Sequence, residues 1–308
     1  MKCVHCGTDS DYKARQAGGS CRQCGRRFAF EPKRDRGLTD LTFKLAIEAI
    51  SDGGRLAWNE DHLYYDVCRR VRRRRIMHRL LRRPMVSLDR SAFELLLGRW
   101  VDAHGPLVGR LEPRVFADVS PDALAPRVDA YGFEQLVICD SDAIADVLLV
   151  NGFHAELKCP VLSGSGYPAH VYDPLIQLLR ERPPATVVVI HDADWEGCRL
   201  AQTVAGDPRW FAGIELPNVI DAGLRPGDAS RFRGLSQLAA GGFDAMTSAV
   251  SPAEAKWLRK FRLELAVARP RVLMGVLAAV LRGETAGAGD SGLWLAGDVW
   301  GDGDDEVG

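Results

Sequence analysis

The sequence predicts an α/β protein with a parallel sheet, preceded by a short metal-binding segment and a basic helical segment. Three observations predict this fold class: two Cys-x-x-Cys pairs near the start, helical periodicity beside a run of arginines, and short apolar runs that alternate with helical segments from residue 135 onward. With 308 residues, 46% hydrophobic and 26% charged, the chain is long enough for about two domains. We expect separate parts at 1–30, 38–105 and 128–282, followed by an acidic, glycine-rich, disordered tail at 283–308.

Residues 1–30 contain two Cys-x-x-Cys pairs separated by fourteen residues, which matches the spacing of a four-thiolate zinc site. The expected ligands are Cys3, Cys6, Cys21 and Cys24. A segment this short cannot bury a core of its own, so the metal would supply its folding free energy. The sequence therefore predicts a structural zinc ribbon, and its role as a docking module or as a nucleic-acid contact stays open.

Residues 38–105 show the apolar periodicity of amphipathic helices. We expect helices at 39–50, 60–75 and 91–103, with a short strand at 55–58 after the turn that follows the first helix. Helix, turn, short strand and basic helix in this order predict a winged-helix or helix-turn-helix domain.

The front third of the chain is basic and the remainder is acidic. Residues 1–110 contain 23 Lys and Arg against 13 Asp and Glu, whereas the remainder contains 17 and 28. Nine arginines fall within residues 69–83, and residues 67–83 contain no acidic side chain. A solvated helix face normally mixes both signs, so we interpret the run as a phosphate-binding surface. The residues expected to bind DNA are Arg69, Arg70, Arg72, Arg73, Arg74 and Arg75.

From residue 128 the pattern alternates between strand and helix. The expected elements are a strand at 135–139, a helix at 142–150, a strand at 155–162, a helix at 171–180, a strand at 187–190 and a helix at 196–204. This order predicts a parallel sheet with right-handed crossovers. Further along, Ser251 and Glu254 form a capping-box pattern at the start of a helix, and residues 271–281 predict one more helix.

The strand at 187–190 ends in two aspartates, Asp192 and Asp194, and Gly197 follows three residues later. Carboxylates at the carboxyl end of a buried parallel strand lie where α/β proteins place their sites. Two neighbouring carboxylates repel each other, and a divalent cation relieves that repulsion. The alternative interpretation is a helix cap, because Asp is a favoured N-cap residue.

These features resemble the Toprim domain, in the form found in the A subunit of topoisomerase VI and in the meiotic double-strand-break enzyme. The matching segments are Asp140 at a strand end, Gly166-Tyr167-Pro168 between strands, residues 192–197 at a second strand end, residues 221–228, the helix near 256–265, and Asp61–Tyr65 at the place of that family's tyrosine-bearing winged helix. The resemblance covers residues 40–280 and implies a winged-helix domain followed by a Toprim domain.

The resemblance also implies a metal-dependent DNA-cleaving protein. Its Mg²⁺ or Mn²⁺ ligands would be Asp140, Asp192 and Asp194, with Asp142 as an auxiliary. Tyr65 would attack phosphorus to form a phosphotyrosyl link, with His62 one helical turn before it. Alternatively a metal-activated water is the nucleophile, which would make the protein more like the nuclease subunit of Wadjet-type plasmid-defence systems, itself a protein with a topoisomerase-VI-like Toprim domain.

The implied partners are double-stranded DNA, a second copy of the chain and a separate ATPase subunit. A double-strand break requires two active sites, and the chain contains no G-x-x-x-x-G-K-[ST] motif. Its first residues form no apolar signal segment and no apolar run is long enough to span a bilayer. We therefore expect a cytoplasmic homodimer.

Three positions depart from the family pattern: Asp140 replaces Glu, Asp61 replaces Arg, and Trp195 replaces Pro. The Asp140 and Asp61 departures favour an alternative function, in which a zinc-ribbon, winged-helix DNA-binding protein keeps the Toprim fold as an inactive scaffold, whereas the intact pair Asp192 and Asp194 argues against it. For Tyr65 the alternative is simple packing within its helix. The remaining cysteines, Cys68, Cys139, Cys159 and Cys198, are expected to be small buried hydrophobic residues.

Overall fold

The computed structural model describes residues 1–13, 19–74, 85–86, 88–112, 134–166, 179, 181–206, 211, 218–239, 249–284 and 294, without the side chains of 72–74 and 205. The chain divides into two compact units. Unit 1 comprises Met1–Leu111 with Arg233–Leu235, and unit 2 comprises Glu112–Phe232 with Ser236–Gly308. Within the described ranges, no helix has the length and apolar character needed to cross a membrane.

Unit 1 contains three α-helices, α2 (Asp40–Ile50), α3 (Glu60–Arg74) and α5 (Arg90–His104), in the part that the structure describes. The hydroxyl of Thr39 caps α2 by accepting from the Thr42 amide, as expected for a helix that begins after a β-region threonine. The ring centroids of Phe43 and Trp100 lie 4.8 Å apart, and those of Phe43 and Phe30 lie 5.1 Å apart. Phe30 therefore ties the cysteine segment to the core of the helices.

The strand expected at 55–58 does not form. Asp52, Gly53 and Gly54 all have positive φ, so the backbone after α2 makes a compact turn. Only Trp58 pairs with another segment, through an isolated parallel bridge to Arg110. An extended run without a partner strand has no ladder to stabilise it, which is why the prediction was wrong.

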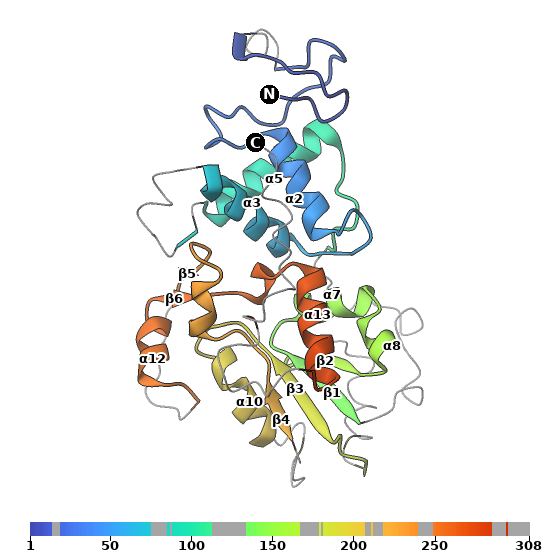
Figure 1. Cartoon of the computed structure of the whole chain (residues 1–308), viewed down its shortest axis with the longest axis vertical. Coiled ribbons are helices and arrows are strands. Elements are labelled where there is room, and N and C mark those ends of the chain that lie inside the picture. The colour runs from blue at the N-terminus through green and yellow to red at the C-terminus, as the bar shows by residue number, and fades with distance from the viewer. Residues whose placement is uncertain are drawn as a thin grey trace. The chain divides into compact units, whose positions relative to one another are not determined.

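Unit 2 is organised around a parallel sheet of four strands in the order β2-β1-β3-β4 (Figure 1). The strands are β1 (Gln135–Cys139), β2 (Val161–Ser163), β3 (Thr186–Ile190) and β4 (Val219–Asp221). The predicted parallel α/β sheet is confirmed. The strand expected at 155–162 is shorter, because α8 (Phe153–Leu157) occupies its first half and Lys158, with φ of 51°, turns the chain before β2.

Both faces of the sheet are buried. Leu136, Ile138, Val187 and Val189 pack on one face with Val204 of α10 (Gly197–Gly206). The alternating strand residues point to the opposite face and are equally buried. Helix α7 (Asp142–Val150) contacts β1 and β2, and α13 (Pro270–Leu281) contacts α7. This double cover explains why the strands read as continuous apolar runs.

The remaining elements of unit 2 lie in its last third. They are η3 (Pro226–Ser230), the antiparallel pair β5 (Gln237–Leu238) and β6 (Phe261–Arg262), α12 (Pro252–Leu258) and η4 (Leu265–Val267). The predicted capping box of α12 is confirmed, with Ser251 and Glu254 bonded reciprocally. Of the helix expected at 171–180 only residue 179 is described, and of the tail only 283, 284 and Trp294. The Trp294 indole is buried and donates to the Gly223 carbonyl over 3.2 Å.

Candidate metal centres

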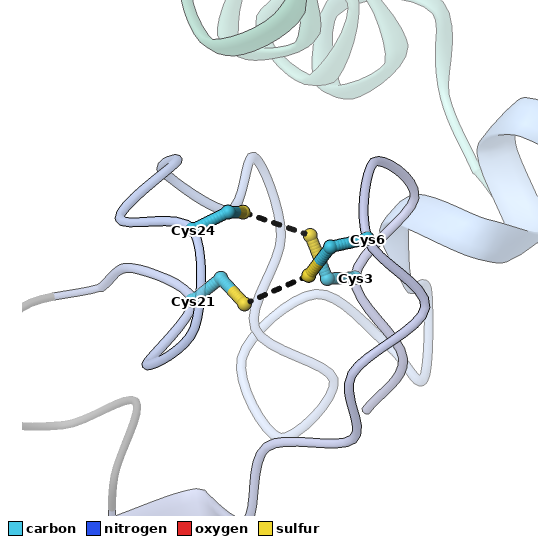
Figure 2. Close-up of side chains that lie close together, drawn as sticks. All are labelled: Cys3, Cys6, Cys21 and Cys24. Atoms are coloured by element: carbon cyan, nitrogen blue, oxygen red, sulfur yellow. Dashed lines mark hydrogen bonds between the residues drawn. The ribbon is translucent and has the colours of Figure 1, made fainter.

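Four cysteine sulfurs from two separate turns meet in unit 1 (Figure 2). The Sγ atoms of Cys3 and Cys24 lie 3.7 Å apart, those of Cys6 and Cys21 lie 3.5 Å apart, and all four lie within 4.8 Å of one another. Sulfurs held about 2.3 Å from a tetrahedral zinc would be separated by about 3.8 Å, so the four thiols fit that ion. The expectation of a four-cysteine metal site is confirmed at the level of geometry: the cluster could bind a metal such as zinc.

The two turns have the same backbone design. The amide of Gly7 donates to the Cys3 carbonyl at 3.0 Å, and that of Gly25 donates to the Cys21 carbonyl at 2.9 Å. Both glycines adopt positive φ, 72° and 71°, which a residue with a Cβ rarely takes. Hydrogen bonds with the side chain and backbone of Thr8 lower the pKa of the Cys6 thiol to about 6. A thiolate at neutral pH is the form that binds metal.

His5 lies between the first two cysteines, and it links the cluster to the helices. Arg26 donates to Nδ1 of His5 at 2.7 Å, so Nε2 carries the His5 proton and donates to Nδ1 of His104 at 3.0 Å. Nε2 of His104 in turn donates to Asp40 at 2.7 Å. The spacing of the cysteines gives no sign of this chain of bonds, since His104 is 99 residues from His5.

Replacing His104 by Leu is expected to destabilise unit 1 by about 1–3 kcal/mol, because the fully buried Asp40 carboxylate loses a charge-assisted hydrogen bond. Zinc content should stay unchanged, since no sulfur is removed. Urea unfolding together with a zinc assay measures both quantities. Arg26→Gln, at the exposed end of the chain of bonds, is the control and should change stability by less than about 0.5 kcal/mol. Loss of zinc from His104→Leu would contradict this assignment.

A second group of polar side chains follows the carboxyl ends of the sheet strands. Asp140 comes directly after β1, Asp192 and Asp194 come after β3, and Asp221 ends β4. The chain leaves β1 toward β2 on one side and leaves β3 toward β4 on the other, so β1 and β3 flank the topological switch point. Parallel α/β sheets bind ligands outside this point.

Each of the three candidate aspartates is held through one oxygen by a main-chain amide. Asp140 Oδ2 accepts from the Asp192 amide at 2.6 Å, Asp192 Oδ1 from the Leu265 amide at 2.6 Å, and Asp194 Oδ1 from the Gly197 amide at 2.8 Å. Asp194 therefore caps α10, as the alternative interpretation expected. The second carboxylate oxygen of each of the three aspartates bonds to no described residue. For Asp140 this oxygen, Oδ1, is also buried. A buried acceptor without a partner calls for a cation or a proton.

The raised pKa values of Asp140 and Asp192 also indicate that these carboxylates favour a proton or a cation. Desolvation, opposed by the bond from the Asp192 amide, raises the pKa of Asp140 to about 6. Desolvation and the neighbouring Asp140 charge raise the pKa of Asp192 well above its ordinary value. In the part of the chain that the structure describes, the four cysteines form a group placed to hold a metal ion, and the three carboxylates do not form such a group. Like charges without a cation between them repel.

The His191 ring lies between the Asp221 carboxylate and the main-chain carbonyl of Asp192. The buried ring donates from Nδ1 to the Asp192 carbonyl at 2.7 Å and from Nε2 to Asp221 at 2.8 Å. Neither acceptor carries a hydrogen, so the ring is protonated on both nitrogens. Burial opposes this charge, but the bond to Asp221 and the Asp221 charge outweigh it and raise the pKa of His191. The ring thus contributes a positive charge to an acidic edge.

Asp142, the expected auxiliary ligand, is bonded to the last residue of β2 and to the loop that follows β2. It lies in the first turn of α7, and its Oδ1 accepts from the hydroxyls of Ser163 and Ser165. The Gly164 amide donates to the Cys139 carbonyl at 2.7 Å, which joins this loop to the end of β1. Tyr167 and Pro168, the rest of the expected loop motif, lie outside the described residues.

Tyr65 and His62 both lie inside unit 1, on α3. Tyr65 is 0% exposed, with its ring edge-on to that of Tyr64 at 5.1 Å. Burial lowers the pKa of His62 to about 4, and its Nδ1 donates to Asn59 at 2.6 Å. Asp61 pairs with Arg90, whose guanidinium lies 4.1 Å from the centre of the Tyr64 ring. The structure therefore brings a cation near the tyrosines but keeps the Tyr65 ring in the core.

The first two arginines of the run are partners of a buried acid. Arg69 and Arg70 pair with Asp66 at 2.8 Å and 2.6 Å, and the Asp66 side chain is 0% exposed. Arg70 also donates to the Leu45 carbonyl on α2. Asp66 precedes the run by three residues, so an i to i+3 and i to i+4 search finds this pairing from sequence. The side chains of Arg72, Arg73 and Arg74 and the whole of Arg75 lie outside the described residues.

Fold and geometry together define a two-unit α/β protein with a four-cysteine metal-type cluster in one unit and an acidic sheet edge in the other. Comparisons with protein-family models, with curated proteins and with solved structures found no significant match to this chain. The case for a function therefore depends on the chemistry of the two centres.

Proposed function

We propose that unit 2 hydrolyses phosphodiester bonds in DNA with Mg²⁺ or Mn²⁺ held by Asp140, Asp192 and Asp194. One observation carries the proposal: three carboxylates at the switch point are each oriented by a main-chain amide and each keep a second oxygen without a described partner. Carboxylate oxygens are the ligands that Mg²⁺ prefers. The resemblance to the Toprim domain and its winged helix supports the same function.

The chain's own groups would do the positioning. Asp140, whose buried Oδ1 lacks a described partner, would accept the cation in place of a proton. The Leu265 and Gly197 amides fix the carboxylates of Asp192 and Asp194. These amides would thereby orient the two carboxylates as ligands of the cation. Bound at this edge, a divalent cation supplies charge for the developing phosphoryl oxygens and lowers the pKa of a water ligand.

Water rather than Tyr65 is the nucleophile in this proposal. A phenol that attacks phosphorus must reach it, and Tyr65 has no exposed surface in unit 1. The low pKa of His62 leaves a neutral ring, whose buried Nε2 bonds to no described group, so it could take a proton only after the core of unit 1 opens. Tyrosine transesterification stays a testable alternative.

Unit 1 would bind the duplex. The basic run supplies the charge, and Arg72 to Arg75 are the proposed phosphate contacts because Arg69 and Arg70 already pair with Asp66. A homodimer and a separate ATPase subunit complete the proposed assembly. The second candidate function is an inactive scaffold that binds DNA, which the replacement of Glu by the shorter Asp140 favours.

The test uses full-length protein and supercoiled plasmid with Mg²⁺ or Mn²⁺. Asp192→Asn and Asp194→Asn are expected to slow nicking about 100-fold or more, because each removes a ligand of a cation that contributes several kcal/mol. Glu156→Gln, an exposed acid of the same unit, is the matched control and should cleave normally. Tyr65→Phe should cleave normally as well.

Two outcomes would separate the alternatives. A covalent protein–DNA adduct that disappears in Tyr65→Phe would establish the transesterase. Normal DNA binding with no nicking by the wild type at any protein concentration would establish the scaffold.

A further inference from the structure

Asp192 is held on three sides, by two side chains and one main-chain amide. Its amide donates to Asp140, its Oδ1 accepts from the Leu265 amide, and its carbonyl accepts from Nδ1 of His191 at 2.7 Å. Next to it, Ala193 forms an isolated bridge with Leu263. The His191 ring is therefore the one side chain of the described part that fixes the peptide after Asp192.

His191 is itself fixed by partners that are distant in sequence. Nε2 donates to Asp221 at 2.8 Å, across 30 residues. Asp221 also accepts from the Gly223 amide at 3.1 Å and from Arg225 at 3.3 Å. The ring can pivot only if this arrangement breaks, so the His191 side chain joins β4 to the end of β3, beside the main-chain bonds from Ala222 to Val189 and from Leu224 to His191.

The backbone leaves no spare room around the ring. A Cβ added at Gly223 would lie 2.3 to 2.4 Å from three ring atoms of His191. A Cβ added at Gly197 would lie 2.4 Å from the Asp192 carbonyl oxygen and 3.1 Å from Nδ1 of His191. The contacts of 2.3 to 2.4 Å are far below van der Waals contact, so the two glycines are needed for this packing. Gly197 is the glycine of the D-x-D-x-x-G stretch, and this close contact explains why a glycine is required at that position.

We propose that His191 is a positioning residue for the acidic edge: clamped between Asp221 and the Asp192 carbonyl, it holds Asp192 in the orientation in which its carboxylate meets a divalent cation. The proposal rests on the proposed metal site of unit 2. It assigns to His191 no contact with cation or substrate, and it makes Gly223 a requirement of that site although Gly223 bears no ligand atom.

The test measures two properties of the full-length protein. The first is Mn²⁺ affinity, read by electron paramagnetic resonance of the protein with its zinc retained. The second is hydrogen exchange of the amides from Asp192 to Gly197 without added Mn²⁺. His191→Phe keeps a ring and removes both donors, Asp221→Asn keeps the shape and removes a charge, and His154→Phe is the control on a half-exposed histidine of the same unit.

His191→Phe is expected to weaken Mn²⁺ binding 10- to 100-fold, the range found when a group that orients a metal ligand is lost. Exchange at residues 192–197 should rise while that of β1 stays unchanged. Asp221→Asn should show a smaller change in the same direction, and His154→Phe should show none. If His191→Phe fails to fold, Asp221→Asn carries the test alone.

Gly223→Ala gives an independent perturbation, because it displaces the ring without deleting it. It should reproduce the His191→Phe result, whereas Gly206→Ala, with open space around its Cβ, should not. Unchanged Mn²⁺ affinity and unchanged exchange in His191→Phe would overturn the proposal. If wild type and Asp192→Asn bind Mn²⁺ equally, the metal site itself is wrong; raised exchange in His191→Phe would then still support the clamp, and unchanged exchange would overturn it.

Discussion

Cys21→Ser is expected to abolish tight zinc binding and to unfold residues 1–30. We expect this segment to need the metal because its described core is small: Ala29 and Phe30 are buried, but the turns around the sulfurs are mostly exposed. Structural zinc sites contribute on the order of 10 kcal/mol of apparent binding free energy, so losing one of four thiolates should cost several kcal/mol. Zinc content and thermal unfolding measure the effect.

The change should extend beyond the cysteine segment. Phe30 packs against Phe43 and its amide donates to Asp40, so α2 should become less protected against hydrogen exchange. Cys198→Ala is the control, since Cys198 is a buried thiol of unit 2 outside the cluster. Full zinc content in Cys21→Ser, or loss of zinc in Cys198→Ala, would contradict the four-cysteine site.

Asp140→Asn is expected to stabilise unit 2 at pH 7.5 in the absence of Mg²⁺ and Mn²⁺, although it removes a proposed ligand. The pKa of Asp140 is raised to about 6 in the folded protein, against about 3.9 in an unfolded chain. Between these pH values the folded state binds more protons, so stability falls as pH rises from about 4 to about 6. At about 1.4 kcal/mol per pKa unit, the ionised carboxylate costs up to about 3 kcal/mol above pH 7.

The amide of asparagine cannot ionise, so the variant should be more stable than the wild type by about 2 kcal/mol at pH 7.5 and by little at pH 4. Urea unfolding at both pH values measures the difference, after dialysis against buffer without added Mg²⁺ or Mn²⁺. Added Mn²⁺ should stabilise the wild type and leave Asp140→Asn unaffected. A variant that is less stable than the wild type at pH 7.5 would show that Asp140 is a structural acceptor with no strain to release.

Much of the architecture follows from local patterns in the sequence. The spacing of four cysteines predicts their cluster, and the alternation of apolar runs with helical segments predicts the parallel sheet with β1 and β3 at their observed places. Capping by Ser251 and Glu254 was equally predictable. Each of these follows from a pattern within short segments: the Cys-x-x-Cys turns, the apolar runs of single strands, and the Ser251–Glu254 spacing.

The strand expected at 155–162 shows where a local pattern is insufficient. A short apolar run fits a strand or a helix, and the choice depends on the packing it finds. Helix α8 buries Phe153 and leaves Ala155 and Glu156 exposed, so this segment contacts the core through Phe153.

The sequence alone determined which residues have the chemistry for a metal: four thiols at zinc spacing, and aspartates after two buried strands. Only the tertiary structure decided how they are held. The bond from the Asp192 amide to Asp140 spans 52 residues, the His191–Asp221 pair spans 30, and the His5–His104 pair spans 99. It also placed Tyr65 in the core and Arg69 and Arg70 on Asp66. The physical reason is that a ligand type is a property of one residue, whereas its orientation, burial and pKa depend on neighbours that the fold brings together.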